Sequence, residues 1–368
     1  MGDEWITSAW AQVTTKIDLM IEQLGDRSPH RTVDGIYDDM RLDWWTSGFW
    51  PGMLWIMHDR TGDARYRNEA WAWDERFEQC FLKESNLHHD VGFQFLPTAV
   101  MKYIVSEDRD GRRRGLAAAN FLAGRYNLKG QFLRAWNLDR TGWAIIDSAM
   151  NLSLLFWASQ ETGDPRYRHI AVSHADTIIR NFIREDGSVC HIVSFNPETG
   201  EYIEELGGQG FAAGSSWSRG QAWAIYGMAN AYRYTRDVRF LHASQRVAHY
   251  FLSALPKDGI PPWDFRAVSL EKVPKDTSAA AIAASGLLEL SAHLNEAESN
   301  LYLNGATRML QALTSSYTTW DRKDQQGILL EGTGNKPAEE NVNVSLIYGD
   351  YFYVEALAKL KGWRNRIF

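Results

Sequence analysis

Helices of two different kinds alternate along most of this 368-residue chain. One kind has a charged face, as in residues 166–180, where Arg, His and Asp recur between apolar residues. The other kind is nearly uncharged and rich in small residues, as in 220–230 and 278–288. A helix that is apolar on every side has to be enclosed by neighbours, whereas a helix with one polar face lies at the surface. The alternation therefore predicts an enclosed ring of helices inside an exposed ring.

Apolar periodicity and capping residues predict twelve helices, which pair into six hairpins. Residues 61–66, 162–167 and 235–240 share a Thr-x-Asp-x-Arg pattern, in which Asp is the expected N-cap of a new helix. The expected fold is all-α, a single (α/α)6-barrel domain over residues 1–368. The helix ranges are 4–24, 46–60, 63–84, 91–106, 110–126, 147–161, 164–184, 216–234, 238–255, 277–293, 297–316 and 347–361.

Composition excludes several classes of function. The net charge of −7 argues against a nucleic-acid-binding protein, because such proteins carry basic surfaces. No run approaches the roughly 18 apolar residues of a membrane span, and the first residues lack the basic and apolar regions of a signal peptide. Cys80 and Cys190 are too few for a disulfide framework. We therefore expect a cytoplasmic protein without a nucleic-acid or membrane partner, and the sequence leaves the oligomeric state open.

Clusters of polar and aromatic residues lie just before the enclosed helices or in their first turns. If those helices run parallel in one ring, all the clusters meet at the same mouth. The clusters occupy residues 43–48, 88–93, 145–147, 215–223, 275–278 and 348–353.

Asp90 and Asp147 are the candidate catalytic acids at this mouth. Two neighbouring carboxyls allow one to stay ionised while burial and its charge raise the pKa of the other, as general acid catalysis near neutral pH requires. Helix N-termini oppose this effect because they favour the anion. The structural alternative for both residues is an N-cap, and for Asp264 and Asp350 structural roles are expected.

Other residues at the mouth suit a sugar ligand. Arg219 could bind a carboxylate through a bidentate fork, and Trp side chains could stack on a sugar ring, although each is equally a candidate for the core. His88 and His89 are adjacent, so they do not share a helix face as metal-binding histidines do, and no metal or cofactor is expected. The expected substrate-binding residues are Trp45, His89, Trp136, His191, Gln209, Trp217, Arg219 and Trp223.

Four motifs, taken together and in order, resemble those of the unsaturated glucuronyl hydrolases of glycoside hydrolase family 88. They are residues 88–93, 145–151, 217–226 and 348–353, and the resemblance runs from about residue 30 to the end. It implies a six-hairpin α/α barrel. It also implies hydration of the C4=C5 vinyl ether of a 4,5-unsaturated glucuronic acid, at the non-reducing end of lyase-generated oligosaccharides from glycosaminoglycans or similar polymers.

The resemblance further implies roles for single residues. Asp147 would protonate C4 and assist the addition of water at C5, while Asp90 would hold substrate hydroxyls and help to set the protonation of Asp147. In the family, the region of residues 331–343 helps to decide tolerance of sulfate on the neighbouring sugar, and no clear sulfate pattern occurs here, so the parent polysaccharide stays open. Three alternatives remain: an unsaturated rhamnogalacturonyl hydrolase acting on pectin fragments, a sugar epimerase, and a non-catalytic carbohydrate-binding barrel.

Overall fold

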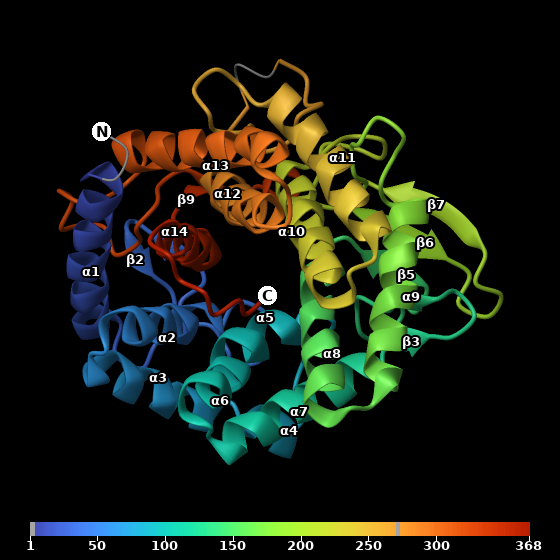
Figure 1. Ribbon diagram of the computed structural model, residues 1–368, viewed down its shortest axis with the longest axis horizontal. Coiled ribbons are helices and arrows are strands. Elements are labelled where there is room, and N and C mark those ends of the chain that lie inside the picture. The colour runs from blue at the N-terminus through green and yellow to red at the C-terminus, as the bar shows by residue number, and fades with distance from the viewer. Residues whose placement is uncertain (1–3, 270–272) are drawn as a thin grey trace.

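Two concentric rings of helices form the molecule, as Figure 1 shows down their common axis. The computed structural model describes residues 4–269 and 273–368. Each inner helix contacts the next one, and α14 returns to α2, so the inner ring closes. The inner ring consists of α2 (Phe49–Thr61), the run α5 (Val91–Phe95), η1 (Leu96–Val100) and α6 (Met101–Ser106), α8 (Ser148–Thr162), α10 (Ser218–Thr235), α12 (Thr277–Ser291) and α14 (Ile347–Leu360). The outer ring consists of α1 (Glu4–Leu24), α3 (Ala64–Arg76), α7 (Arg109–Ala123), α9 (Pro165–Asn181), α11 (Val238–Ala254) and α13 (Glu296–Ser316).

All twelve predicted regions are helical, which confirms the (α/α)6 barrel, but two of them are interrupted. The predicted helix 63–84 ends at Arg76 and resumes as the short α4 (Gln79–Leu82). The predicted helix 91–106 contains the π-helical turn η1, with Pro97 near its start; proline lacks the N–H that a regular α-helical turn would use. Within the described ranges, no helix is long and apolar enough to cross a lipid bilayer.

Short strands in the loops between hairpins were not predicted. Their pairs form three two-stranded ribbons and one three-stranded sheet, ordered β5-β6-β7. None of these sheets enters the barrel ring; they brace the loops on the side where the inner helices begin. The strands are β1 (Thr32–Val33), β2 (Ile36–Tyr37), β3 (Tyr126–Asn127), β4 (Phe132–Leu133), β5 (Trp143–Ile145), β6 (Ile192–Phe195), β7 (Tyr202–Leu206), β8 (Gly332–Asn335) and β9 (Glu340–Val344).

The turns from inner to outer helices follow the predicted capping pattern. Gly62 and Gly163 end α2 and α8 with φ of 74° and 73°, a left-handed conformation that glycine adopts without strain. The carboxylates of Asp63, Asp164 and Asp237 then accept hydrogen bonds from backbone N–H groups two residues further on, at 2.8, 2.9 and 3.0 Å. These turns lie at the end of the barrel where the inner helices finish.

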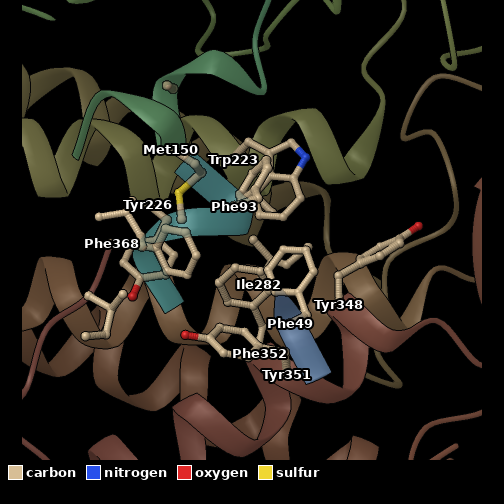
Figure 2. Close-up of a cluster of buried hydrophobic side chains, with 14 of the residues drawn as sticks. Phe49, Phe93, Met150, Trp223, Tyr226, Ile282, Tyr348, Tyr351, Phe352 and Phe368 are labelled. Carbon is tan, nitrogen blue, oxygen red and sulfur yellow. The ribbon is translucent and has the colours of Figure 1, made fainter. Parts of the chain in front are cut away.

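Aromatic side chains fill the interior of the inner ring (Figure 2). The ring centroid of Phe93 lies 4.9 Å from that of Trp223 and 5.8 Å from that of Phe368. Phe352 contacts Trp223 at 5.4 Å and Phe368 at 5.5 Å. Because these rings are buried and interlocked, the barrel contains a packed core and not an open channel.

Candidate active site

A cavity of about 370 Å³ opens where the inner helices begin. Five of the six predicted clusters contribute lining residues, and the sixth, around Asp276, reaches the cavity through its ion pair with Arg219. The predicted convergence on one mouth is therefore confirmed. Of the ten predicted site residues, those that line the cavity are Trp45, His89, Asp90, Trp136, Asp147, Gln209 and Arg219.

Asp147 occupies the N-cap position of α8, yet its side chain caps nothing. Its Oδ2 atom is buried and has no hydrogen-bond partner within the described part of the chain. Burial raises the pKa of the Asp147 carboxyl to about 7, while the positive charge of Arg219 opposes that rise. Asp147 therefore does not cap the helix with its side chain, and the expectation of a capping role is wrong. With a pKa of about 7, its carboxyl is mostly protonated below pH 7.

His191 faces Asp147 with its Nε2 atom 3.8 Å from Oδ2. The backbone N–H of Gln209 donates to His191 Nδ1 at 2.8 Å, a shorter contact than the 3.3 Å from Nδ1 to the carbonyl oxygen of Gly207. Burial lowers the pKa of His191 to about 3. The ring is therefore neutral and carries its proton on Nε2. At 3.8 Å this N–H and Asp147 are too far apart for a direct hydrogen bond, so both groups are free to contact a third atom placed beside them.

Asp90 stands at the start of α5 and, like Asp147, does not cap its helix. Asn151 Nδ2 donates to Asp90 Oδ1 at 3.0 Å, and His89 Nε2 lies 3.1 Å from the same oxygen. Burial, followed by the charge of Asp147, raises the pKa of Asp90 well above its usual value.

The tautomer of His89 bears on the protonation of Asp90. His89 Nδ1 lies 2.8 Å from the carbonyl oxygen of Ala135, so Nδ1 must carry the proton. Burial lowers the pKa of His89 well below its usual value, and the neutral ring therefore presents the lone pair of Nε2 to Asp90. This arrangement favours a proton on the Asp90 carboxyl, because a lone pair facing a carboxylate would be repelled.

Arg219 lines the cavity, but its guanidinium is already engaged by the protein. Nη1 donates to Asp276 Oδ2 at 2.7 Å and to the carbonyl oxygen of Thr333 at 2.5 Å. Nη2 donates to Gln209 Oε1 at 2.8 Å and to the carbonyl oxygen of Gly334 at 2.6 Å. The predicted bidentate fork to a ligand carboxylate is therefore wrong for this conformation. Arg219 instead joins α10, α12 and β8, and it supplies positive charge at the cavity wall.

The four candidate tryptophans divide into two pairs. Trp45 and Trp136 line the cavity, as expected of residues that stack on a sugar. Trp217 and Trp223 are buried. Trp217 packs on His191 with ring centroids 4.2 Å apart. Trp223 belongs to the aromatic core, and it opposes the rise in the pKa of Asp147. The burial of this second pair is what the core alternative expects, and their contact with a substrate stays a prediction.

Several lining residues were missed because they come from loops without a recognisable motif. Asn341 Nδ2 lies 3.3 Å from His30 Nε2, a contact between residues more than 300 positions apart. Asn341 has a φ of 58°, which asparagine tolerates better than most residues. No local signal in the sequence identifies such a pair. The lining residues that lie outside every region named from the sequence are His30, Asn86 and Asn137, whereas Gly334, Asn335, Glu340 and Asn341 fall in the region 331–343 without having been named singly.

One group in the described ranges could coordinate a metal ion. His88, His89 and Asp90 place one potential ligand atom each within 4.8 Å of one another, although the two histidines are adjacent in sequence. The turn at residues 89–90 allows this, with the two imidazole centroids 5.0 Å apart. The chemistry proposed below has no step that requires an ion.

Known proteins share both the sequence and this architecture. The model for Glycosyl Hydrolase Family 88 matches residues 16–363. An unsaturated glucuronyl hydrolase of Bacillus sp. (strain GL1) is 36% identical over 93% of each chain. An unsaturated chondroitin disaccharide hydrolase of Streptococcus pyogenes serotype M1 is 34% identical over 99% of this chain and 93% of its own. The crystal structure of an unsaturated glucuronyl hydrolase from Streptococcus agalactiae superposes with a TM-score of 0.94 at 32% identity, over 99% of this chain and 94% of that one. The chain therefore belongs to glycosyl hydrolase family 88.

Proposed function

We propose that the protein releases 4,5-unsaturated glucuronic acid from the non-reducing end of small oligosaccharides by hydrating the C4=C5 vinyl ether. Such substrates are the products of lyases acting on glycosaminoglycans or similar polymers. The observation that carries the proposal is Asp147, a buried, uncapped acid whose pKa of about 7 suits proton donation near neutral pH. The names of the related hydrolases support the substrate class.

The first step is transfer of a proton from the Asp147 carboxyl to C4. The C4=C5 electron pair forms the new C–H bond, and positive charge develops at C5 and the ring oxygen. The resulting Asp147 carboxylate is stabilised by the charge of Arg219 and lies close to the developing cation, so the two charges attract within a site of low dielectric.

Water then adds to C5 and gives up one proton to the Asp147 carboxylate, which restores the acid. The Nε2–H of His191, 3.8 Å from Asp147 Oδ2 and otherwise without a partner in the described residues, is placed to donate a hydrogen bond to that water or to a substrate oxygen. The hemiketal formed at C5 opens to a ketone, and C1 then releases the neighbouring sugar. No nucleophile has to attack the anomeric carbon, so the paired carboxylates of ordinary glycosidases are not needed.

Binding is assigned to the remaining lining residues. Trp45 and Trp136 would contact the faces of the sugar rings, and Asp90, with its proton, would hold hydroxyl groups. Arg219 would attract the substrate carboxylate through its charge. The reaction consumes small saccharides, and we place it in the cytoplasm, where the buried thiols of Cys80 and Cys190 would remain reduced.

A thio-linked substrate tests the reaction. The phenyl thioglycoside of 4,5-unsaturated glucuronic acid resists attack at its anomeric carbon, but hydration at C5 converts it to an open chain that loses thiophenol. We expect thiophenol release together with loss of the ultraviolet absorbance of the conjugated double bond. Cleavage of only the oxygen-linked glycoside would contradict hydration and point to ordinary glycosidase chemistry.

A further inference from the structure

We propose that Arg125, which lies outside the cavity, is a positioning residue of the active site. Its guanidinium holds the loop of residues 134–137 so that this loop presents Trp136 to the substrate and orients His89 against Asp90. The proposal rests on the function proposed for the cavity, and it assigns a task to a residue that does not line that cavity.

Arg125 directly follows the end of α7 and donates to four consecutive residues of the loop. Nε donates to the carbonyl oxygen of Arg134 at 2.8 Å, and Nη2 to the carbonyl oxygens of Ala135 and Trp136 at 2.9 and 2.8 Å. Nη1 donates to Asn137 Oδ1 at 2.8 Å. A planar fork with fixed donor directions can satisfy such a row of acceptors, whereas an ammonium group cannot.

Two of these contacts continue into the catalytic cavity. The carbonyl oxygen of Ala135 accepts from Arg125 and also from His89 Nδ1 at 2.8 Å, and this second bond sets the tautomer that His89 turns toward Asp90. Trp136, whose carbonyl oxygen Arg125 holds, carries its indole on the cavity wall. The guanidinium is thus one contact away from both residues.

Asn137 connects the same loop to the segment that precedes α5. While its Oδ1 is held by Arg125, its Nδ2 donates to Asn86 Oδ1 at 3.0 Å and to the carbonyl oxygen of Leu87 at 3.1 Å. The segment that begins there carries Asp90. The loop and the acid are therefore fixed relative to each other through one arginine.

Arg125 holds this loop from a half-buried position. Burial lowers its own pKa to about 10, and its observed hydrogen bonds are all to uncharged acceptors. Such a position is unfavourable for a cation, so its contacts with the loop are the feature that needs an explanation.

Arg125→Lys and Arg125→Ala test the proposal, with Arg308→Lys and Arg308→Ala as matched controls. Arg308 also donates to two loop carbonyl oxygens, those of Pro256 and Lys257, both at 2.8 Å, and none of these three residues lines the cavity. We expect both Arg125 variants to lose about 100-fold in kcat/KM, the usual effect of a misplacement of about 1 Å, with an unchanged circular dichroism spectrum. The Arg308 variants should keep wild-type kcat/KM.

Chemical rescue separates positioning from general stability. Arg125 borders a surface hollow of about 640 Å³, so added guanidinium ions should reach the vacated site and restore activity to Arg125→Ala. The same ions should leave the activity of the Arg308 variants unchanged. Wild-type kcat/KM in Arg125→Lys, or equal losses in the Arg308 variants, would overturn the proposal.

A crystal structure of Arg125→Ala gives a result that does not depend on the substrate. We expect Trp136 to be displaced and the His89–Ala135 hydrogen bond to be lost. An unchanged loop would refute the positioning role even if the wild-type protein proved inactive on unsaturated glucuronides, whereas a displaced loop in an inactive protein would count against the proposed function alone.

Discussion

Aspartates stand at the starts of helices in both rings of the barrel, and they behave in opposite ways. In the outer ring, Asp63, Asp164 and Asp237 cap α3, α9 and α11 through backbone N–H groups. In the inner ring, Asp147 and Asp90 hold the equivalent position in α8 and α5 but make no capping bond. An aspartate at a helix start thus stabilises its helix where it accepts hydrogen bonds from backbone N–H groups. We propose that it serves as a proton donor where, as in Asp147, a buried oxygen has no partner among the described residues.

Asp276 shows that ring membership alone does not decide the outcome. It opens the inner helix α12, yet its Oδ1 accepts from the backbone N–H of Ser278 at 3.1 Å and its Oδ2 pairs with Arg219. Because both oxygens of this carboxylate already accept hydrogen bonds, one from a charged partner, the group is not available as a proton donor. The two proposed acids, Asp90 and Asp147, make no such capping bond, and buried carboxyls of this kind are candidates for chemistry.

The largest expected effect comes from replacing the uncapped acid. Asp147→Asn keeps the shape of the side chain but removes the transferable proton, so turnover should fall by about 10² to 10⁴ while substrate binding persists. Asp164→Asn, at a capped position, is the matched control and should retain full turnover. Steady-state kinetics on an unsaturated disaccharide measure both, and near-normal turnover in Asp147→Asn would remove this residue from its proposed role.

The pH dependence of kcat/KM should report the same acid. Since Asp147 must be protonated to donate and its pKa is raised to about 7, activity should decline above about pH 7 and approach a tenfold loss for each further pH unit. A rate that stays level well into the alkaline range would be incompatible with a donor of this pKa.

Stability should respond in the opposite sense at the two kinds of position. Asp164→Ala removes a capping bond and should lower the free energy of unfolding by about 1 kcal/mol without altering turnover.

Because the folded-state pKa of Asp147 is raised, its carboxyl destabilises the folded protein progressively between about pH 4 and pH 7. Asp147→Asn should therefore raise Tm at about pH 8 but not at about pH 4. Chemical and thermal denaturation measure these effects, and a lower Tm for Asp147→Asn at about pH 8 would argue against an uncompensated buried acid.

The smallest effect is expected from metal removal. The group of His88, His89 and Asp90 could bind a cation, but proton donation by Asp147 does not use one. Dialysis against EDTA should leave kcat and KM unchanged. If activity disappeared and returned with added zinc, the group would be a cofactor site and the proposed chemistry would need a Lewis acid.

Features set by local sequence were the ones that could be predicted. Helix periodicity and caps such as Asp164 depend on residues a few positions apart, and the alternation of polar and apolar helices is enough to order the two rings. Asp90 and Asp147 could be placed at the mouth, but not distinguished from N-caps, because that depends on whether their oxygens find donors in three dimensions. The engaged guanidinium of Arg219 could not be foreseen either, since two of its acceptors are backbone carbonyls of Thr333 and Gly334.

The most direct test is to follow the ultraviolet absorbance of unsaturated glucuronyl disaccharides, sulfated and unsulfated, with wild-type protein, Asp147→Asn and Asp164→Asn in parallel. Hydration destroys the chromophore formed by the C4=C5 bond and its carboxylate. We expect decay with the wild type and with Asp164→Asn, and almost none with Asp147→Asn. No decay with the folded wild-type protein on any glucuronyl disaccharide, or equal decay with all three proteins, would contradict it.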